Sequence, residues 1–443
     1  MGMRPPISYA LANIPRYTSY PTAPHFGPLE QPEYRDWLRA VPAGEALSIY
    51  LHVPFCKSLC WYCGCHTTVT RNAGRIERYT AALEAEALLL AEALRGHGGI
   101  GHLHLGGGTP TALGATGLAT VLRRLRSEFG FRPGAELAAE LDPRNLDEAT
   151  VAVLAEAGLT RASLGVQDIS STVQHRIGRV QSEDCVAGAV ERLRAHGITS
   201  INMDVMYGLP NQGVAEVQAT SRFAAQLGAD RVAVFGYAHV PWMKPHQNAI
   251  DSASLPGALE RLLQAEAAEA VLAQAGYVAI GLDHFAKPED EMAVAFRAGR
   301  LHRNFQGYTT DTAPALVGLG ASAIGSLPTG YAQNEADERK YVALLEAGLL
   351  PVKRGRALTE DDRRRRHVIE RVMCDFALDL GALPTEILDE AMPALARLDA
   401  DGIIALERDF LRVTPAGQRH VRHVAAAFDA YLGTGSGRHS AAV

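Results

Sequence analysis

The sequence predicts an α/β fold in which parallel strands and helices alternate to form a barrel or part of a barrel. From residue 47 to about residue 300, short β-rich runs alternate with helical runs, which is the pattern of βαβ units. Polar and glycine-rich residues follow each expected strand. In parallel α/β folds ligands bind at that edge, because the loops there can vary without disturbing the packed sheet. Chance is a weaker explanation, because every expected strand shows the pattern.

The repeat contains six expected strands and a seventh run that could also be a strand. These runs are residues 47–53, 101–105, 135–141, 161–166, 200–206, 231–238 and 277–285. The helical run from Ile76 to Leu94 has apolar residues at helical spacing, with glutamates on the other face. The run 146–158 carries Asp147 and Glu148 in its first turn and ends at Gly158, the expected C-terminal glycine.

Two segments flank the repeat, so that three domains are predicted. Residues 1–46 form an arm rich in proline and aromatic residues, residues 47–345 form the barrel domain, and residues 346–443 form a mostly helical C-terminal domain with a hairpin in GIIALERDFLRVT. That element order also resembles a winged helix, in which DDRRRR (361–366) would contact DNA. A solvated helix face with acids in its first turn is the better interpretation. The tail from 433 to 443 is expected to be mobile.

The overall composition disfavours several classes of protein. The chain has 443 residues and a formal net charge of −6, which does not indicate a nucleic-acid binder. The first residues contain Pro, Arg and Tyr where a signal peptide would be apolar, and no apolar run is long enough for a membrane span. Cys185 and Cys374 are isolated, which is unlike a secreted disulfide framework. We therefore expect a protein of the reducing cytoplasm.

Four of the six cysteines lie in the ten residues CKSLCWYCGC, from Cys56 to Cys65. A structural zinc site would use two separated pairs of ligands, and no second pair exists, so that zinc is poorly supported. The spacing C-x3-C-x2-C of Cys56, Cys60 and Cys63 lets one loop reach three corners of a 4Fe–4S cluster. Cys65 lies only two positions beyond Cys63 and is poorly placed to reach the fourth. Three thiolates would leave one iron open for a substrate.

This motif, placed after a strand that opens a parallel barrel, resembles the radical S-adenosylmethionine (SAM) superfamily. The stretches IYLHVPFCKSLCWYCGCHTTVTR, LHLGGGTPT, SLGVQD, DVMYGLP, GLDHFAKP and LHRNFQGYTT are similar to the oxygen-independent coproporphyrinogen III oxidase family. PRYTSYPTA resembles the N-terminal arm of that family. The resemblance runs from about residue 14 to the final helix and implies a part-barrel of the radical SAM type.

The resemblance implies a 4Fe–4S cluster on Cys56, Cys60 and Cys63, with Cys65 not a ligand, and two molecules of SAM. The first SAM is implied at Tyr50, Gly107, Glu140 and Ile324. The second SAM is implied at Tyr62, Gly108, Thr109, Gln167, Arg179, Asp204 and Ala238. From the residues alone, Gly106–Gly108 could be only a tight turn and Glu140 only a salt-bridge partner.

Four residues are implied to be catalytic: Tyr50, Glu140, Phe305 and Gln306. The last two lie in HRNFQGYTT, which without the resemblance would be interpreted as a structural loop. The substrate of the family, coproporphyrinogen III, is a large tetrapyrrole with four carboxylates, so its binding site is expected to contain cations and aromatic surface. Arg303, Arg16 and Tyr20 are candidates for that role.

The implied activity is anaerobic oxidative decarboxylation of two propionate side chains of coproporphyrinogen III, which gives the vinyl groups of protoporphyrinogen IX in haem biosynthesis. A 5′-deoxyadenosyl radical begins it, an unidentified donor supplies electrons, and a monomer is expected. One alternative is a haem-binding chaperone of the same superfamily without oxidase activity. The CGC cysteine and the RYTSYPT arm favour the oxidase. A second alternative is a non-enzymatic module that holds zinc or an electron-transfer cluster.

Overall fold

The computed structural model describes residues 5–433, in two compact units that each combine several segments of the chain. We refer to Phe26–Asp204 and Asp311–Ala357 as the cysteine-loop unit, because it contains the four clustered cysteines. The segments Met1–His25, Val205–Thr310 and Leu358–Val443 form the C-terminal unit. The tail expected to be mobile lies, from residue 434 on, outside the described residues. The domain boundaries expected from the sequence stay a prediction.

The cysteine-loop unit is built on a sheet that is parallel in its middle. Its strands are β1 (Gly27–Pro28), β2 (Leu47–Val53), β5 (Ile100–Gly107), β6 (Phe131–Leu141), β7 (Arg161–Gln167), β14 (Ala315–Leu319), β15 (Ile324–Ser326), β16 (Gly330–Asn334) and β17 (Val352–Ala357). They lie in the order β1-β17-β16-β15-β14-β2-β5-β6-β7, followed by the start of β8 (Ser200–Tyr207). The strands from β14 to β7 in this order pair in parallel. The others pair antiparallel. The predicted α/β class is confirmed.

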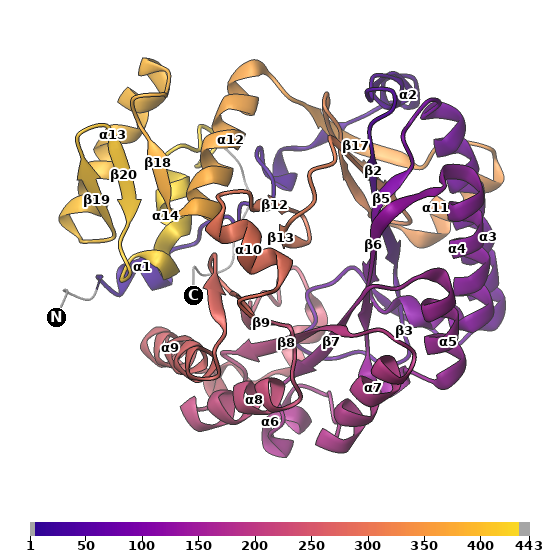
Figure 1. Cartoon of the computed structure of the whole chain (residues 1–443), viewed down its shortest axis with the longest axis horizontal. Helices are drawn as coiled ribbons and strands as arrows, with labels where there is room; N and C mark the ends of the chain where they lie inside the picture. The colour runs from indigo at the N-terminus through magenta and orange to yellow at the C-terminus, as the bar shows by residue number, and fades with distance from the viewer. Residues whose placement is uncertain (1–4, 434–443) are drawn as a thin grey trace. The chain divides into compact units, whose positions relative to one another are not determined.

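Helices cover the parallel strands, and Figure 1 shows α3 (Ala73–Ala93), α4 (Gly114–Phe129) and α5 (Glu148–Ala157) along one face of β2, β5 and β6. Both helices expected from the sequence are present. The Asp147 side chain accepts a hydrogen bond from the Thr150 amide at 2.8 Å, and Gly158 ends α5 in a left-handed conformation. The unit also contains α2 (Gln31–Arg39), α6 (Ser171–Arg176), α7 (Glu183–Ala195), α11 (Glu338–Glu346) and the 3₁₀ turns η2 (Pro110–Leu113) and η3 (Pro143–Asn145). Among residues 5–433, no helix combines the length and apolarity needed to cross a membrane.

A buried carboxylate joins α3 to the loop after β14 and to the end of β16. Glu86 is 1% exposed, and it accepts hydrogen bonds from the Gly320 amide at 2.7 Å, Asn334 Nδ2 at 2.6 Å and the Tyr341 hydroxyl at 2.5 Å. Burial raises the pKa of Glu86 to about 7, although these three hydrogen bonds lower it. The Glu86 carboxyl group therefore links α3 to its neighbours by buried hydrogen bonds.

The C-terminal unit combines the end of β8 with a small antiparallel sheet, a hairpin and helices. Its strands are β9 (Arg231–Gly236), β10 (Val278–Ile280), β11 (His284–Ala286), β12 (His302–Asn304), β13 (Gly307–Thr309), β18 (Ala377–Asp379), β19 (Ile404–Glu407) and β20 (Phe410–Val413). Its helices are α1 (Ser8–Leu11), α8 (Val214–Gln226), α9 (Ala258–Gln274), α10 (Glu291–Arg297), α12 (Glu360–Asp375), α13 (Thr385–Ala400) and α14 (Val421–Ala426), with the 3₁₀ turns η1 (Ala23–His25), η4 (Pro245–Ala249), η5 (Ser252–Ser254) and η6 (Gln418–His420). The expected hairpin in GIIALERDFLRVT is β19–β20.

Two sequence-based expectations for this unit were wrong in part. Residues 277–285 do not form one strand: they form β10 and the start of β11, because Gly281 takes a φ of +57° and reverses the chain. The DDRRRR run does open α12 with acids in its first turn, but its face is not wholly solvated. Arg365 is 5% exposed and contacts Asp361 at 2.8 Å and Glu390 at 2.6 Å.

Candidate metal and cofactor site

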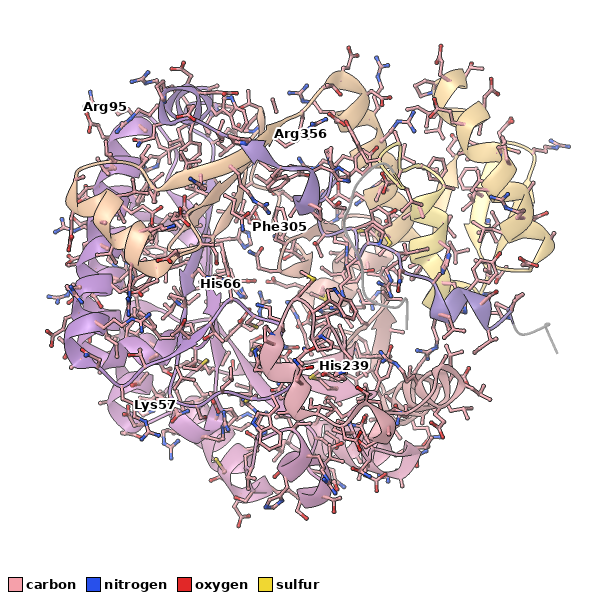
Figure 2. All side chains as sticks on the ribbon, turned by 180° about the vertical axis from the view of Figure 1, so that it is seen from behind. Lys57, His66, Arg95, His239, Phe305 and Arg356 are labelled. Atoms are coloured by element: carbon pink, nitrogen blue, oxygen red, sulfur yellow. The ribbon has the colours of Figure 1, made fainter. Side chains whose placement is uncertain are left out.

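The cysteine loop is closed at its base by two short parallel strands, β3 (Phe55–Cys56) and β4 (Thr68–Val69). Cys56 lies on β3 itself, so that this thiol has the most rigid support of the four. Cys60 is 7% exposed, whereas Cys65 is exposed. None of the six cysteines, all within residues 5–433, is in a disulfide. The exposed Lys57 follows Cys56, and His66 Nε2 donates to the carbonyl oxygen of Ala336 at 2.7 Å (Figure 2).

Hydrogen-bond donors lie against two of the sulfur atoms. The Thr67 hydroxyl donates to Cys56 Sγ at 3.2 Å. Arg144 Nη2 and Arg179 Nη1 both lie 3.6 Å from Cys60 Sγ. Positive charge and donated hydrogen bonds favour a thiolate over a thiol, and they are also what tunes the reduction potential of an iron–sulfur cluster. Burial raises the pKa of the Cys56 thiol to about 11, so that metal binding at this residue would release a proton.

The donor set is of the kind that an iron–sulfur cluster uses. In the part of the chain that the structure describes, no three or more His, Cys, Asp or Glu side chains are arranged as a site for a metal ion. The thiolates of a 4Fe–4S cluster each bind a different iron, so they need not converge on one point. The loop supplies three thiols, and donors from Thr67, Arg144 and Arg179 lie beside two of them, as is common for thiolates that bind a cluster. The residues present therefore fit the group that the sequence predicts.

The three glycines after β5 are packed against protein atoms. A Cβ on Gly106 would lie 3.0 Å from Glu140 Oε1, and a Cβ on Gly108 would lie 2.5 Å from the Phe55 carbonyl oxygen. Gly107 has a φ of +112°, which side chains disfavour, and it would place a Cβ 2.8 Å from the Val53 carbonyl oxygen. This close packing alone explains glycine at all three positions, so that a role in binding SAM stays a prediction for Gly107 and Gly108. The neighbouring Thr109 is 3% exposed, and its amide donates to the Phe55 carbonyl at 2.8 Å.

Glu140 lies at the end of β6 with its carboxylate held in place. His104 Nε2 lies 3.1 Å from Oε1, and the Gly107 amide donates to Oε2 at 3.3 Å. Burial alone would raise the pKa of Glu140, but the hydrogen bond and charge of His104 and the Gly107 amide hold it below its usual value. Glu140 is therefore a carboxylate at neutral pH and can accept hydrogen bonds from a ligand.

Tyr50 lies on β2, beside Glu140 and near Ile324. A Cβ on Gly106 would lie 3.0 Å from the Tyr50 ring as well as from Glu140. Tyr50 pairs with Gly318 on β14, and a Cβ on Gly318 would lie 2.9 Å from the carbonyl carbon of Ile324. Three of the residues predicted for the first SAM, together with Gly107, thus come together.

The Tyr50 hydroxyl has a defined hydrogen-bond direction. His52 Nε2 donates to the His66 carbonyl oxygen at 2.9 Å, so that in the neutral ring Nδ1 accepts. The Tyr50 hydroxyl therefore donates to His52 Nδ1, at 3.0 Å. The contact fixes this phenol toward the base of the cysteine loop, because His52 also holds the backbone of His66.

Two of the residues predicted for the second SAM, Gln167 and Arg179, lie side by side. A Cβ on Gly165 would lie 2.8 Å from Gln167 Nε2 and 2.9 Å from Arg179 Nη2, so that these two side chains converge. Arg179 Nη2 also lies 3.4 Å from Asp142 Oδ1. The Arg179 Nε atom is buried without a hydrogen-bond partner, which is costly unless a ligand completes it.

Tyr62 lies near Arg179, whereas Asp204 has its hydrogen-bond partners on β7 and β8. Burial raises the pKa of Tyr62, and the charge of Arg179 lowers it, which places the phenol near that guanidinium. Asp204 accepts hydrogen bonds from Ser163 Oγ at 3.3 Å and Asn202 Nδ2 at 2.9 Å. Its carboxylate is therefore positioned by neighbours on β7 and β8.

Three predicted site residues belong to the C-terminal unit. Phe305 and Gln306 form the turn between β12 and β13, and the Gln306 amide donates to Asn304 Oδ1 at 2.9 Å. The Ala238 carbonyl accepts a hydrogen bond from Gln247 Nε2 at 3.2 Å. Tyr20, a candidate for contacting the substrate, is 2% exposed and packs in the apolar core of this unit, so it offers no aromatic surface to a ligand.

Sequence reasoning missed several residues of the site. Arg144, Thr67 and His104 contact a cysteine or Glu140, yet none belongs to a quoted metal motif. Thr67 and His104 lie in two of the stretches that carry the family resemblance. For Arg144 the available signal was position, because it follows β6 directly after Asp142 and Pro143, at the edge where ligands are expected. The Arg144 guanidinium donates to Asp142 Oδ2 at 2.7 Å, which aims it at Cys60.

Comparisons with known proteins show which family the chain resembles over its whole length. The model of the radical SAM superfamily matches residues 50–224. Over 99% of both chains, the sequence is 47% identical to the oxygen-independent coproporphyrinogen III oxidase of Bradyrhizobium diazoefficiens. It is 44% identical to the enzyme of that name from Paracoccus denitrificans, over 98% of this chain and 97% of the relative. The solved structure of coproporphyrinogen III oxidase from Escherichia coli, described as a radical SAM enzyme, matches with a TM-score of 0.90 and 38% identity, over 95% of this chain and all of that one.

Proposed function

Because this chain belongs to the oxygen-independent coproporphyrinogen III oxidase family of the radical SAM superfamily, we propose that it converts coproporphyrinogen III to protoporphyrinogen IX. In this reaction two propionates each lose carbon dioxide, one hydrogen atom and one electron, and each becomes a vinyl group. The observation that carries the proposal is the full-length similarity together with a cysteine loop whose donor set fits a cluster. The enzyme is an oxidoreductase of haem biosynthesis.

When bound, the 4Fe–4S cluster and SAM supply an organic radical that removes hydrogen from the substrate. Cys56, Cys60 and Cys63 would hold the cluster, while Cys65 stays outside the ligand set. Arg144 and Arg179 place positive charge against Cys60, which stabilises the negative charge of a reduced centre.

The first SAM would lie against Tyr50, Gly107, Glu140 and Ile324. Glu140 is ionised and oriented, so it can accept hydrogen bonds from hydroxyl groups such as those of a ribose. The backbone of Gly107 can approach a ligand because it has no Cβ. Tyr50 is held by His52 and would fix one side of the site.

We propose that a second SAM binds beside Gln167 and Arg179, with Tyr62, Gly108, Thr109 and Asp204 as the further candidates in this unit. Ala238, in the C-terminal unit, stays a prediction from the sequence. The buried Arg179 Nε, which lacks a partner in the protein, supports an acceptor from a ligand at this place. Phe305 and Gln306 are proposed to close over the substrate. Action as a cytoplasmic monomer with an unidentified electron donor stays a prediction.

The test is an anaerobic incubation of the reconstituted chain with coproporphyrinogen III, SAM and dithionite, with the products analysed by mass spectrometry after oxidation. The proposal expects protoporphyrin, lighter than coproporphyrin by two molecules of formic acid. Haem binding without any vinyl product would contradict it and favour a chaperone. The number of SAM molecules bound per chain, measured by equilibrium dialysis, tests the second site separately.

A further inference from the structure

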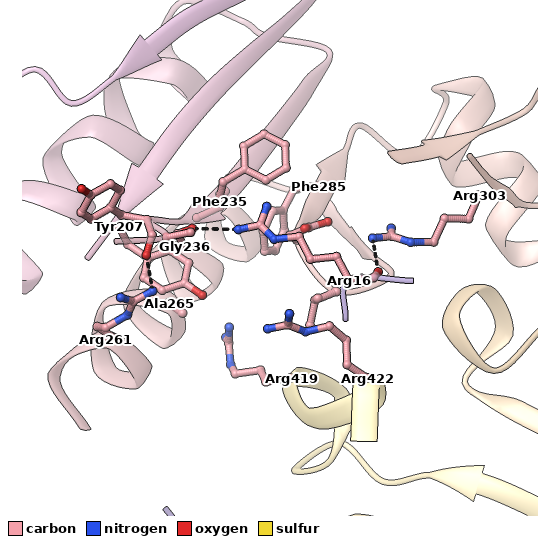
Figure 3. Close-up of a pocket in the computed structure, with 15 residues that line it drawn as sticks. Arg16, Tyr207, Phe235, Gly236, Arg261, Ala265, Phe285, Arg303, Arg419 and Arg422 are labelled. Atoms are coloured by element: carbon pink, nitrogen blue, oxygen red, sulfur yellow. Dashed lines mark hydrogen bonds between the residues drawn. The ribbon is translucent and has the colours of Figure 1, made fainter. Parts of the chain in front are cut away.

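The C-terminal unit contains a pocket lined by five arginines, which we call the arginine pocket (Figure 3). They are Arg16, Arg261, Arg303, Arg419 and Arg422. They come from four separate segments: the N-terminal arm, α9, β12 and the contiguous stretch of η6 and α14, which carries both Arg419 and Arg422. Figure 3 shows the guanidinium groups from the arm, α9, η6 and α14 directed into one space. Five neighbouring cations repel one another, and this repulsion destabilises the folded protein unless negative charge offsets it.

Most of these cations are held by neutral groups. Arg16 Nη2 lies 3.4 Å from the Gly236 carbonyl oxygen, and Arg261 Nη2 donates to the Tyr237 carbonyl at 2.8 Å. Arg303 donates to the carbonyl oxygens of Tyr17 and Arg16, both at 3.2 Å. Carbonyls position a guanidinium but do not neutralise it, so that the charge of the pocket remains.

Few carboxylates compensate the charge. Among the described residues that line the pocket, Asp283 is the only acid, and it pairs with His284 at 2.7 Å. Arg419 contacts Glu269, which does not line the pocket. Burial raises the pKa of Asp283, but His284 and, to a smaller extent, the charges of Arg303 and Arg16 lower it to about 2. The arginine pocket thus has a clear excess of positive charge.

Donors in the pocket also lack acceptors. Arg261 Nε and Arg303 Nη1 are buried without a hydrogen-bond partner, which is rare in folded proteins. Burial and the charge of Arg16 lower the pKa of Arg422, which is 5% exposed, to about 10. A bound anion would supply both the missing acceptors and the missing negative charge.

The rest of the lining indicates what kind of anion fits. Tyr207, Phe235 and Phe285 add aromatic surface to the pocket. A small inorganic anion would contact only the guanidinium groups. A large apolar ring system that carries carboxylates would contact both the guanidinium groups and the aromatic side chains. Within the proposed function, the substrate is such a molecule.

We propose that the arginine pocket binds the propionate carboxylates of the tetrapyrrole that the reaction leaves intact. A propionate that loses carbon dioxide must give up its negative charge. Guanidiniums that stabilise that charge would bind the starting carboxylate more strongly than the transition state and slow the step. The arginines therefore suit the propionates that substrate and product share. This inference rests on the proposed function.

The test measures porphyrin binding to the full-length chain by fluorescence titration. The stable probes are coproporphyrin III, protoporphyrin IX, which keeps only the two shared propionates, and the tetramethyl ester of coproporphyrin III, which has no carboxylate. Arg16→Gln and Arg261→Gln are each expected to weaken binding of both acids by on the order of ten- to hundredfold, because a charged hydrogen bond is lost. Binding of the ester should stay unchanged, which shows that the variants are folded.

Arg412→Gln is the matched control, since Arg412 is exposed in the same unit and outside the pocket. Unchanged affinity for both acids in Arg16→Gln and Arg261→Gln would overturn the proposal. So would a loss confined to coproporphyrin III, because the arginines would then hold the reacting propionates. Failure of the proposed function has a different signature, which is the absence of vinyl product from the wild-type chain whatever its porphyrin affinity.

Discussion

Substituting alanine for Gly108 should destabilise the cysteine loop through a single added carbon. The new Cβ would lie 2.5 Å from the Phe55 carbonyl oxygen, about 0.9 Å short of the ordinary contact distance of 3.4 Å. It would also overlap Thr67 Oγ1, the hydroxyl that donates to Cys56 Sγ. Phe55 is fully buried, so that its backbone cannot move aside without moving Cys56, the next residue.

The magnitude follows from two effects. Overpacking a tight site costs about 1–3 kcal/mol. A shift of the Phe55 carbonyl also weakens the 2.8 Å hydrogen bond from the Thr109 amide, and a buried donor left without a partner costs about 1–3 kcal/mol. Together these lower the stability of the unit by about 2–6 kcal/mol, which lowers the apparent Tm by about 5–20 °C.

The assay is thermal unfolding by circular dichroism, with the iron content after anaerobic reconstitution measured in parallel. Gly108→Ala should lower both values. Gly188→Ala on α7 is the control, because a Cβ there meets no atom within 4 Å and alanine favours a helix. If Gly108→Ala matches this control in Tm and in iron content, the inferred packing of the loop is wrong.

Three further predictions concern the cysteine-loop unit. The Cys65→Ser variant should keep its iron after reconstitution, whereas serine in place of Cys56, Cys60 or Cys63 should remove it. Loss of iron in Cys65→Ser would indicate that four thiols bind the cluster. Arg144→Gln should lower the midpoint potential of the reconstituted cluster, because a positive charge beside Cys60 is lost, and an unchanged potential in a spectroelectrochemical titration would refute this. Burial raises the pKa of Glu86 in the folded protein to about 7. The free energy of unfolding should therefore fall by about 3 kcal/mol as the pH rises from about 4.5 to 7, and Glu86→Gln should not show this fall because glutamine does not titrate. Urea unfolding at pH 5 and pH 8 measures this difference, and an equal gap between the two proteins at both pH values would count against it.

Local signals predicted the parallel half of the fold well. The apolar run 47–53 coincides with β2, since a strand buried on both faces has a nearly continuous apolar sequence. Asp147 and Gly158 delimit α5, because an N-terminal cap and a left-handed C-terminal glycine are properties of single residues. The spacing of the clustered cysteines likewise lies within one loop and could be interpreted directly.

Features built from distant residues could not be predicted in this way. The antiparallel strands β15 to β17 are only a few residues long and contain glycines at close approaches such as Gly325, so they leave little periodic pattern. The arginine pocket gathers residues as far apart as Arg16 and Arg422, which no local pattern relates. The donors to Cys60 depend on Asp142 aiming Arg144, which only coordinates reveal.

The measurement that tests the central claim most directly is electron paramagnetic resonance of the dithionite-reduced, reconstituted chain with and without SAM. A cluster held by Cys56, Cys60 and Cys63 leaves one iron to be coordinated by SAM, so its g values should change when SAM is added. The same change should occur in Cys65→Ser. Identical spectra with and without SAM, or no cluster signal at all, would contradict the account.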